Sequence, residues 1–133
     1  MKKPTQKTIR KKLIKQLDTE WAKAIKTIAG HKCEICGSTD RLASHHFHTK
    51  KAHGSVRWYL SNGVCLCIKC HFKIHNSSHN TEMVASVIEV RGQEWETDLR
   101  VKAKKIVKFS ISELEIILNT LRIANNESGE INE

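Results

Sequence analysis

The 133-residue sequence lacks any apolar run that approaches the ~20 residues needed to cross a bilayer. Its start, MKKPTQKTIRKK, is basic but lacks the apolar stretch and the small-residue cleavage site of a secretory signal. Internal repeats and low-complexity linkers are also lacking. These absences argue against a membrane protein, a secreted protein and a repeat array. We therefore expect a cytoplasmic protein with no membrane partner.

Acidic residues are scarce in the first two-thirds of the chain. Lys and Arg outnumber Asp and Glu by nine to two in residues 1–30 and by seven to two in residues 31–80. In residues 81–133 acidic residues prevail by ten to seven, and the whole chain carries a formal net charge of +9. A basic field attracts phosphate polyanions through counterion release, which favours nucleic acid as a partner. The alternative is that the lysine-rich helices are simply solvated.

Length and composition indicate one globular domain. A chain of this size has room for a single core that buries roughly two-thirds of the unfolded surface. Its 39% hydrophobic and 28% charged residues are ordinary for a globular protein. Within it we distinguish four segments: a basic N-terminal helix (1–30), a compact core (31–79), a C-terminal helical extension (80–125) and a polar tail (126–133).

The N-terminal segment has the apolar periodicity of an amphipathic helix over residues 8–29. Gly30 is a natural stop for this helix. The apolar residues recur at three- and four-residue steps: Leu13, Leu17, Trp21, Ile25 and Ile28.

The C-terminal segment contains three further helical patterns of different strength. Residues 81–90 suit a helix or a strand, and we favour a helix. Residues 93–108 indicate a helix, and Ser110 followed by Glu113 can form a capping box that starts the last one. From Asn125 onward the sequence is polar, and we expect it to fray.

Five cysteines leave one unpaired in any disulfide framework. Four of them form two C-x-x-C pairs, Cys33 with Cys36 and Cys67 with Cys70, separated by thirty residues. Two such turns can aim four thiolates at one tetrahedral zinc, and a small domain gains folding free energy from such a metal. The sequence therefore predicts a structural Zn²⁺ bound by these four cysteines. Two unrelated buried or redox pairs are the alternative.

Three side chains near these motifs are left open by the sequence. Cys65 lies two residues before Cys67, so it either competes as a ligand or is a small buried hydrophobe, and we favour the second. His48 and His53 either lie near a bound phosphate or belong to a solvated loop, which we favour.

The segment between and after the cysteine pairs is rich in histidine. His45 and His46 end a short strand-like stretch, and Asn62 precedes Gly63 in a pair that is a strong turn signal. His71 and His75 are four residues apart directly after the second cysteine pair. If a helix starts at this pair, both imidazoles project from one face and can share a cation or a phosphate.

The order His-His, Asn, C-x-x-C-His-x-x-x-His, preceded by an earlier C-x-x-C, resembles the HNH (ββα-metal) endonuclease family over residues 31–79. The resemblance implies an α+β fold: a small zinc-stabilised ββα-metal core, treble-clef-like, with flanking N-terminal and C-terminal helices. It also implies hydrolysis of phosphodiester bonds in DNA with one catalytic divalent metal, which could be Mg²⁺, Mn²⁺, Ni²⁺ or Zn²⁺.

The same resemblance implies a role for each member of the motif. His45 and His71 would be metal ligands, and His46 would be the general base that deprotonates the attacking water. Asn62 would constrain the loop and help to orient the base. His75 would complete the metal site or grip the scissile phosphate.

The chemistry explains why such residues suit this reaction. Phosphodiester hydrolysis needs a deprotonated water and a cation that neutralises the phosphate oxygens. Imidazole accepts a proton near neutral pH without a special environment, and neutral imidazoles hold a metal while leaving positions open. Neighbouring positions at a strand end can point His45 and His46 in different directions, so that one ligates and the other acts as base.

Several basic residues are candidates for contacts with DNA. Arg57 is a candidate phosphate clamp in the loop, and Lys50, Lys51 and Lys73 could add unspecific contacts. The lysine-rich stretch of residues 2–15 has no acidic residue and could be an arm on the DNA backbone. For any one of the four named residues alone we favour a solvated charge, and for residues 2–15 plain solubility is an equal alternative.

A narrower resemblance concerns the order of Arg57, Asn62, the second cysteine pair and the later RGQEW segment with its helical extension. This layout is similar to phage recombination nucleases of the NinG type. Those proteins need not carry the full histidine set, so a preference for DNA junctions does not follow.

Symmetric double-strand cutting by a one-metal site would need two copies, which a homodimer joined through the C-terminal helices would supply.

Two other functions compete with the nuclease. A non-catalytic zinc-binding module that docks on nucleic acid explains the cysteines and the charge but not the order of the histidines. A zinc-stabilised protein-interaction adaptor would use the acidic C-terminal helices and would show no salt-sensitive binding of DNA.

Overall fold

The computed structural model describes the backbone of residues 2–131 and the side chains of residues 2–126. Within them it contains five α-helices, two short 3-10 helices (η) and a two-stranded antiparallel sheet, which confirms the α+β class. The order is α1 (Gln6–Ile28), β1 (Ala43–His46), η1 (Gly54–Val56), η2 (Leu60–Asn62), β2 (Gly63–Leu66), α2 (Ile68–His75), α3 (Asn80–Arg91), α4 (Gln93–Ala103) and α5 (Ile111–Ile131). None of the described helices combines the length and the apolar character of a membrane span.

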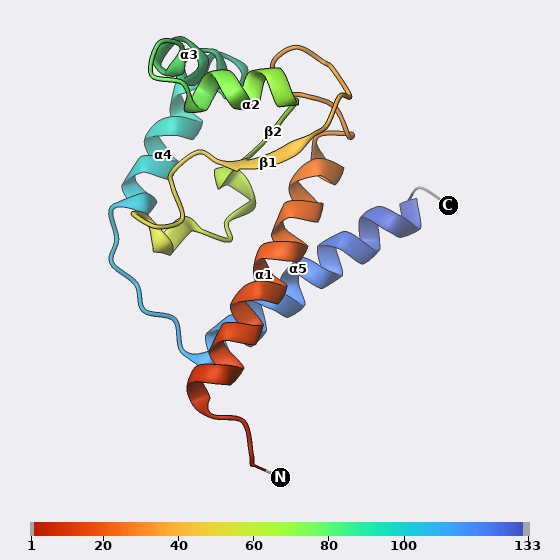
Figure 1. Cartoon of the computed structure of the whole chain (residues 1–133), viewed down its shortest axis with the longest axis vertical. Helices are drawn as coiled ribbons and strands as arrows, with labels where there is room; N and C mark the ends of the chain where they lie inside the picture. The colour runs from red at the N-terminus through yellow and green to blue at the C-terminus, as the bar shows by residue number, and fades with distance from the viewer. Residues whose placement is uncertain (1, 132–133) are drawn as a thin grey trace.

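Helix α1 packs against α5 and forms an apolar core with it (Figure 1). The predicted helix is confirmed and begins slightly earlier, because the Thr5 hydroxyl caps it by accepting a hydrogen bond from the Thr8 N–H at 3.2 Å. Ile28 is exposed, whereas the rest of the predicted apolar stripe is buried. The core residues contributed by the two helices are Leu13, Leu17, Trp21, Ile25, Leu114, Leu118 and Leu121.

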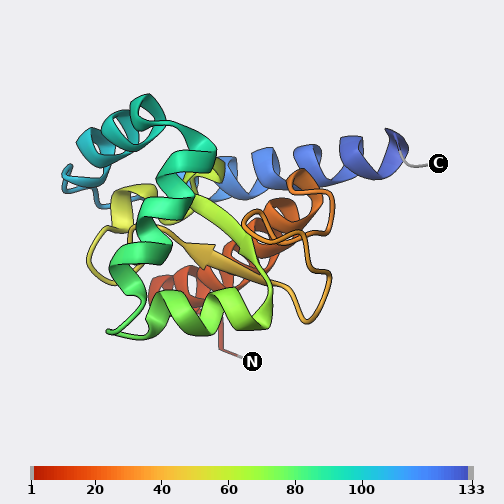
Figure 2. The ribbon, with the colours of Figure 1, turned by 90° about the horizontal axis from the view of Figure 1, so that it is seen from above.

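The sheet lies between α1 and α2 (Figure 2). β1 pairs with β2 in antiparallel register, with Ser44 opposite Cys65 and His45 opposite Val64. Successive side chains of β1 point to opposite faces of the sheet. The Ser44 hydroxyl therefore donates to the Ala22 carbonyl of α1 at 2.6 Å, while His45 meets the histidines of α2.

The pair Asn62-Gly63 does not form the tight turn that its sequence suggests. Asn62 ends η2, and Gly63 begins β2 with an extended backbone. Glycine is needed here for space, because a Cβ atom would overlap the side chain of Ile25 and lie 2.9 Å from Trp21 Cζ2. The close approach of α1 to the sheet therefore selects glycine.

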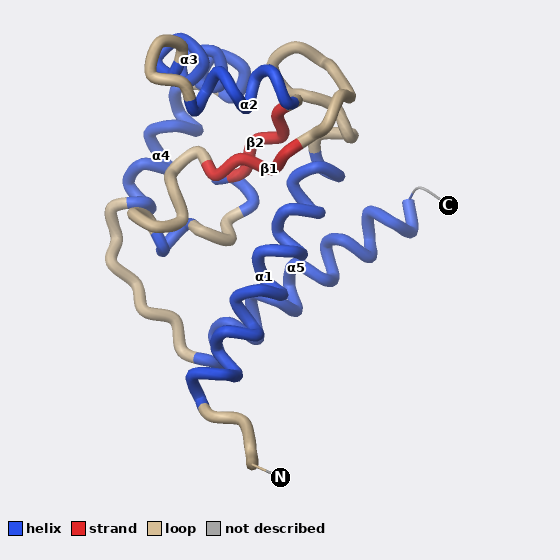
Figure 3. Tube along the Cα trace, viewed as in Figure 1, coloured by secondary structure: helices blue, strands red, loops and turns tan. Residues whose placement is uncertain are grey.

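The helices that follow the sheet differ from expectation in their ends. α3 is a helix, as favoured, but α4 ends at Ala103 rather than near residue 108. Ala103 is the last buried residue of α4 and Ile106 is fully exposed, so no further burial supports the helix beyond this point. Residues 104–110 form the long connection to α5 (Figure 3). The Phe109 carbonyl accepts a 2.7 Å hydrogen bond from Arg10.

The last helix starts where the capping box predicts. Ser110 Oγ accepts from the Glu113 N–H and Glu113 Oε1 accepts from the Ser110 N–H, both at 3.1 Å. Contrary to the expected fraying from Asn125, α5 continues to Ile131, and residues 132–133 lie outside the described part. Asn125 is buried, and its side-chain amide donates to the carbonyl and the carboxylate of Glu20 in α1. This contact holds α5 against α1 beyond its apolar stripe.

Candidate metal centres

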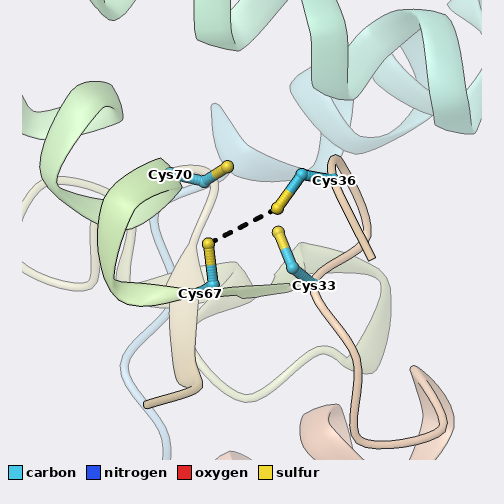
Figure 4. Close-up of side chains that lie close together, drawn as sticks. All are labelled: Cys33, Cys36, Cys67 and Cys70. Carbon is cyan, nitrogen blue, oxygen red and sulfur yellow. Dashed lines mark hydrogen bonds between the residues drawn. The ribbon is translucent and has the colours of Figure 1, made fainter. Parts of the chain in front are cut away.

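The cysteine cluster consists of Cys33, Cys36, Cys67 and Cys70 (Figure 4). The first pair lies in the loop after α1, in a tight turn where the Gly37 N–H donates to the Cys33 carbonyl at 3.0 Å. Gly37 follows this turn at φ 77°, a backbone conformation that glycine adopts without strain. In the second pair, Cys67 is the N-cap of α2 and Cys70 lies in its first turn.

The geometry of the cysteine cluster suits a tetrahedral metal. All four sulfurs lie within 4.8 Å of one another, and Cys36 Sγ is 3.6 Å from Cys67 Sγ. Zinc bound at ~2.3 Å from each sulfur places neighbouring sulfurs about 3.8 Å apart. The prediction that these cysteines gather is confirmed, and they could bind a structural metal such as zinc.

The thiols of the cluster differ in how readily they ionise. Burial opposes ionisation of Cys67, but hydrogen bonds from the Cys70 backbone and from neighbouring thiols outweigh it and lower the Cys67 pKa to about 7. Burial raises the pKa of the Cys70 thiol. Thiolates are the forms that bind a metal, so metal binding would release protons from the thiols. Cys70, whose pKa is raised, would release its proton chiefly in this way.

Cys65 takes no part in the cysteine cluster. Its side chain is fully buried in the core formed with α1 and α5, and burial raises its pKa to about 11. Its backbone N–H donates to Glu34 Oε2 at 2.6 Å, and Arg91 binds the other oxygen of Glu34 at 2.7 Å. The reading of Cys65 as a small buried hydrophobe is therefore the one the structure favours. Glu34 links the first cysteine pair to β2 and α3, a link that its sequence position does not signal.

The histidine cluster consists of His45 on β1 and of His71 and His75 on α2. One ring nitrogen of each lies within 4.8 Å of the others, and the Nε2 atoms of His71 and His75 are 3.0 Å apart. The last two meet because residues four apart share one face of a helix. His45 reaches them because it points toward α2 from the sheet.

This spacing suits a cation with open positions. Two nitrogens that bind a metal at ~2.1 Å with a right angle between them lie about 3.0 Å apart. Burial, and then the neighbouring His75 and His71, lower the pKa of His45 to about 4. Burial also lowers the pKa of His71. The lowered pKa values keep these imidazoles neutral at pH 7, which is the form that binds metals.

His46 lies outside the histidine cluster, on the face of β1 that meets α1. Its ring stacks on Trp21 with centroids 3.8 Å apart and an interplanar angle of 12°. Its Nε2 is 3.0 Å from the Arg57 carbonyl. A carbonyl only accepts, so Nε2 carries the hydrogen and Nδ1 keeps a free lone pair. Burial lowers the pKa of His46, which also favours the neutral ring.

Asp18 and Trp21 of α1 hold the segment that positions His46, and sequence reasoning assigned neither of them a part in the site. Asp18 accepts two hydrogen bonds from the Arg57 guanidinium, at 2.7 and 3.1 Å, and one from Trp58 Nε1 at 2.9 Å. Trp21 Nε1 donates to the Tyr59 carbonyl at 2.9 Å. One signal was available, since Asp18 is one of only two acidic residues among residues 1–30.

Asn62 ties the two ends of the loop between β1 and β2. Its Oδ1 accepts from the His48 N–H at 2.8 Å and its Nδ2 donates to the His48 carbonyl at 3.0 Å. The side chain is fully buried. This is the geometry that a loop-constraining residue needs.

His48 and His53 lie side by side at the same loop, with ring centroids 5.2 Å apart, and His53 Nδ1 contacts the Ala103 carbonyl at 3.2 Å. These contacts disfavour a freely solvated loop.

The candidate DNA contacts divide into two groups. Lys50, Lys51 and Lys73 are exposed, and the charge of Lys50 lies close enough to His46 to influence its pKa. Arg57 is engaged with Asp18, so a phosphate would have to compete for its guanidinium. Its backbone carbonyl, rather than its charge, contacts the histidine motif.

The chain was compared with protein-family models, with curated proteins and with solved structures, and none of the three comparisons gave a match.

Proposed function

We propose that the protein is a metal-dependent DNA endonuclease of the HNH type, in which the histidine cluster holds the catalytic cation. The convergence of His45, His71 and His75 within 4.8 Å carries this proposal. These residues come from a strand and a helix that are distant in the sequence, and the fold brings their ring nitrogens together. A bound divalent cation would neutralise the phosphate and lower the pKa of a coordinated water.

The residues around the cluster can supply the rest of the chemistry. Three imidazoles leave positions for water and a phosphate oxygen, as catalytic metal sites require. His46 follows His45 directly, and its free Nδ1 can accept a proton from the attacking water. The Trp21 stack and the Arg57 carbonyl restrict the rotation of its ring. Asn62 keeps the loop after His46 in one conformation.

The arrangement of elements supports a ββα-metal core of treble-clef type. The first cysteine pair precedes the two strands, and the second pair opens the helix α2 that follows them. The same helix carries His71 directly after Cys70 and His75 one turn further on, both members of the histidine cluster. A zinc ion in the cysteine cluster would therefore fix the start of α2 and, through it, the position of His71 and His75.

DNA is the proposed substrate because of charge. The net charge of +9 is concentrated in residues 1–80, which include both clusters and exposed lysines such as Lys50 and Lys73. Such a surface attracts a polyanion, and its affinity for the polyanion falls as the salt concentration rises.

Cleavage of supercoiled plasmid by the zinc-loaded protein tests the proposal, with Mg²⁺, Mn²⁺, Ni²⁺ or Zn²⁺ added in turn. Wild type should give nicked or linear product with at least one of these metals. His46→Ala should lower the rate by about 10²–10⁴-fold, the usual contribution of a general base, with zinc content unchanged. His45→Ala should require far more added metal. His79→Ala, an exposed histidine outside the cluster, is the matched control and should cut as wild type does.

The strongest competitor is a non-catalytic zinc module that binds DNA through its basic face. It is favoured by one observation, that His46 lies on the α1 face of β1 rather than in the histidine cluster. Under this alternative, plasmid would be retarded in a gel in a salt-dependent manner but never cut. A His46→Ala protein that cuts at the wild-type rate would leave a nuclease without the proposed base.

A further inference from the structure

Helix α2 exposes a surface that adjoins the histidine cluster. It lies at the surface of the molecule (Figure 1). Its inner side buries Cys70 and Ile74. Because each residue advances about 100° around a helix, the opposite side is centred on Phe72. Residues 68 and 75 share this stripe at steps of four and three.

The edges of this outer surface differ in chemistry. His71 and His75 follow one edge, and Lys69 and Lys73 follow the other. Phe72 and Ile68 lie between them, and together with the lysines and Arg41 they line a shallow depression. We call this surface the Phe72 face; it comprises Arg41, Ile68, Lys69, Phe72 and Lys73.

Phe72 is unusually exposed for an aromatic residue. Its side chain is 70% exposed, Tyr59 is 41% exposed, and the other five aromatic residues of the chain are buried or half-buried. A buried phenylalanine would contribute about 1.5–3 kcal/mol to folding, which this position forgoes. The ring is thus available to a partner.

The charge of the Phe72 face favours an anionic partner. Lys69 and Lys73 flank the ring, and Arg41 adds a third positive charge beside them. Asp40 is the acidic residue that contacts this group, through an ion pair with Arg41 at 3.1 Å. An aromatic ring between cations is the combination that binds single-stranded nucleic acid, by stacking a base and holding its phosphates.

We propose that the Phe72 face binds an unpaired nucleobase of the strand that enters the histidine cluster. The inference rests on the proposed nuclease function and adds a substrate class to it. Side chains three apart on a helix, such as Phe72 and His75, have Cβ atoms about 5–6 Å apart. This distance suits one nucleotide whose phosphate lies at the histidine cluster and whose base stacks on the Phe72 ring. The next phosphate of the strand would then lie near Lys69 and Lys73.

The substrate class follows from the geometry of stacking. In a duplex both faces of each base are covered by neighbouring bases, so the ring would have to displace one of them. An unpaired base at a gap, a flap or a single-stranded end offers its face without this cost. The protein should therefore bind and cut such DNA in preference to fully paired DNA.

Fluorescence anisotropy with zinc-loaded protein, without added catalytic metal, tests the inference. The probes are a labelled single strand, the same strand fully paired, and single strands in which one base at a time is removed to leave an abasic nucleotide. Phe72→Ala should weaken single-strand binding by about 5- to 150-fold, the range for loss of one stacked base. Phe72→Trp should restore binding, because indole stacks equally well. Ile116→Ala, 66% exposed on α5, is the matched control and should change nothing.

The abasic probes separate stacking from a general loss of contact. At one position, removal of the base should weaken binding by wild type but not by Phe72→Ala, because the same interaction is already gone. Unchanged single-strand binding by Phe72→Ala, with plasmid cleavage intact, would overturn this inference and leave the nuclease proposal standing. Wild type that neither binds nor cuts DNA would overturn both. Self-association of wild type that Phe72→Ala abolishes would make this face a protein interface instead.

Discussion

Substitution of Asp18 by Asn removes a charge from the contact between α1 and the segment that positions His46, while keeping the size of the side chain. The carboxylate accepts three hydrogen bonds, two from Arg57 and one from Trp58. An Asn oxygen can keep the bond to Trp58, but its amide group faces the guanidinium as a second donor. The substitution therefore loses at least one charged hydrogen bond and creates a donor–donor contact.

The expected cost lies between two limits. Breaking a fully buried ion pair costs about 3–5 kcal/mol, whereas an exposed pair contributes about 0–1 kcal/mol. The Arg57 and Asp18 side chains are 22% and 32% exposed, so water can replace part of the lost contact. We expect Asp18→Asn to lower the free energy of unfolding by about 1–3 kcal/mol.

Urea unfolding of the zinc-loaded protein, followed by circular dichroism, measures this cost. With a slope of about 2 kcal/mol per molar urea, the midpoint should fall by about 1 M. Asp40→Asn is the control, because Asp40 pairs with Arg41 where the two side chains are 55% and 71% exposed. It should leave the urea midpoint nearly unchanged, because water screens an exposed ion pair. Equal midpoints for the two variants would refute the assignment of Asp18 as an anchor.

Under the proposed function, Asp18→Asn should also slow cleavage, because the Arg57 carbonyl would no longer be held against His46.

Three further results are expected. Gly63→Ala should lower the thermal midpoint by several degrees, because the new methyl group overlaps the side chain of Ile25 and α1 must shift, at about 1–3 kcal/mol; an unchanged midpoint would contradict the close packing. Without metal at the histidine cluster, the pKa of His45 lies near 4 in the folded protein and near 6.5 in the unfolded one. The unfolded chain then binds more protons, so stability is full above pH 6.5 and falls by about 3 kcal/mol towards pH 4. Urea midpoints across this range should fall less steeply in His45→Gln than in wild type; a fall remains because burial also lowers the pKa of His46 and His71. Cys67→Ala should lose zinc and unfold, whereas Cys65→Ala should keep one zinc per chain by atomic absorption; zinc loss from the second variant alone would reverse the ligand assignment.

The two clusters could be predicted from the sequence because local spacing fixes much of their geometry. A C-x-x-C turn aims both sulfurs at one point, and residues four apart share one face of a helix. Cys67, Cys70, His71 and His75 all belong to the start or the body of α2, so one short element positions two of the four cysteines and two of the three histidines. The sequence therefore predicted which residues gather, although not the distances between them.

The ends of the C-terminal helices could not be predicted, because tertiary contacts decide them. The pattern that suggested a helix to residue 108 ignores that Ile106 has nothing to pack against. The polar sequence after Asn125 suggested fraying, but it omits the hydrogen bonds from Asn125 to Glu20 of α1. Local helix propensity reports neither the missing packing partner of Ile106 nor the contact between Asn125 and Glu20.

The surroundings of His46 also lay beyond the sequence. Asp18 and Arg57 are 39 positions apart, and nothing local pairs them. Trp21 was correctly expected in the core, and its second role against the imidazole of His46 appears only when α1 lies across the sheet. Arg57 was expected to hold a phosphate, whereas in the structure its guanidinium holds Asp18.

Anomalous X-ray diffraction from crystals of the zinc-loaded protein soaked in Mn²⁺ would locate the metal bound at each of the two clusters. Data at the zinc edge should show zinc among the four sulfurs, and data at the manganese edge should show manganese within bonding distance of His45, His71 and His75. A manganese peak that these three imidazoles do not share, or none at saturating Mn²⁺, would contradict the account.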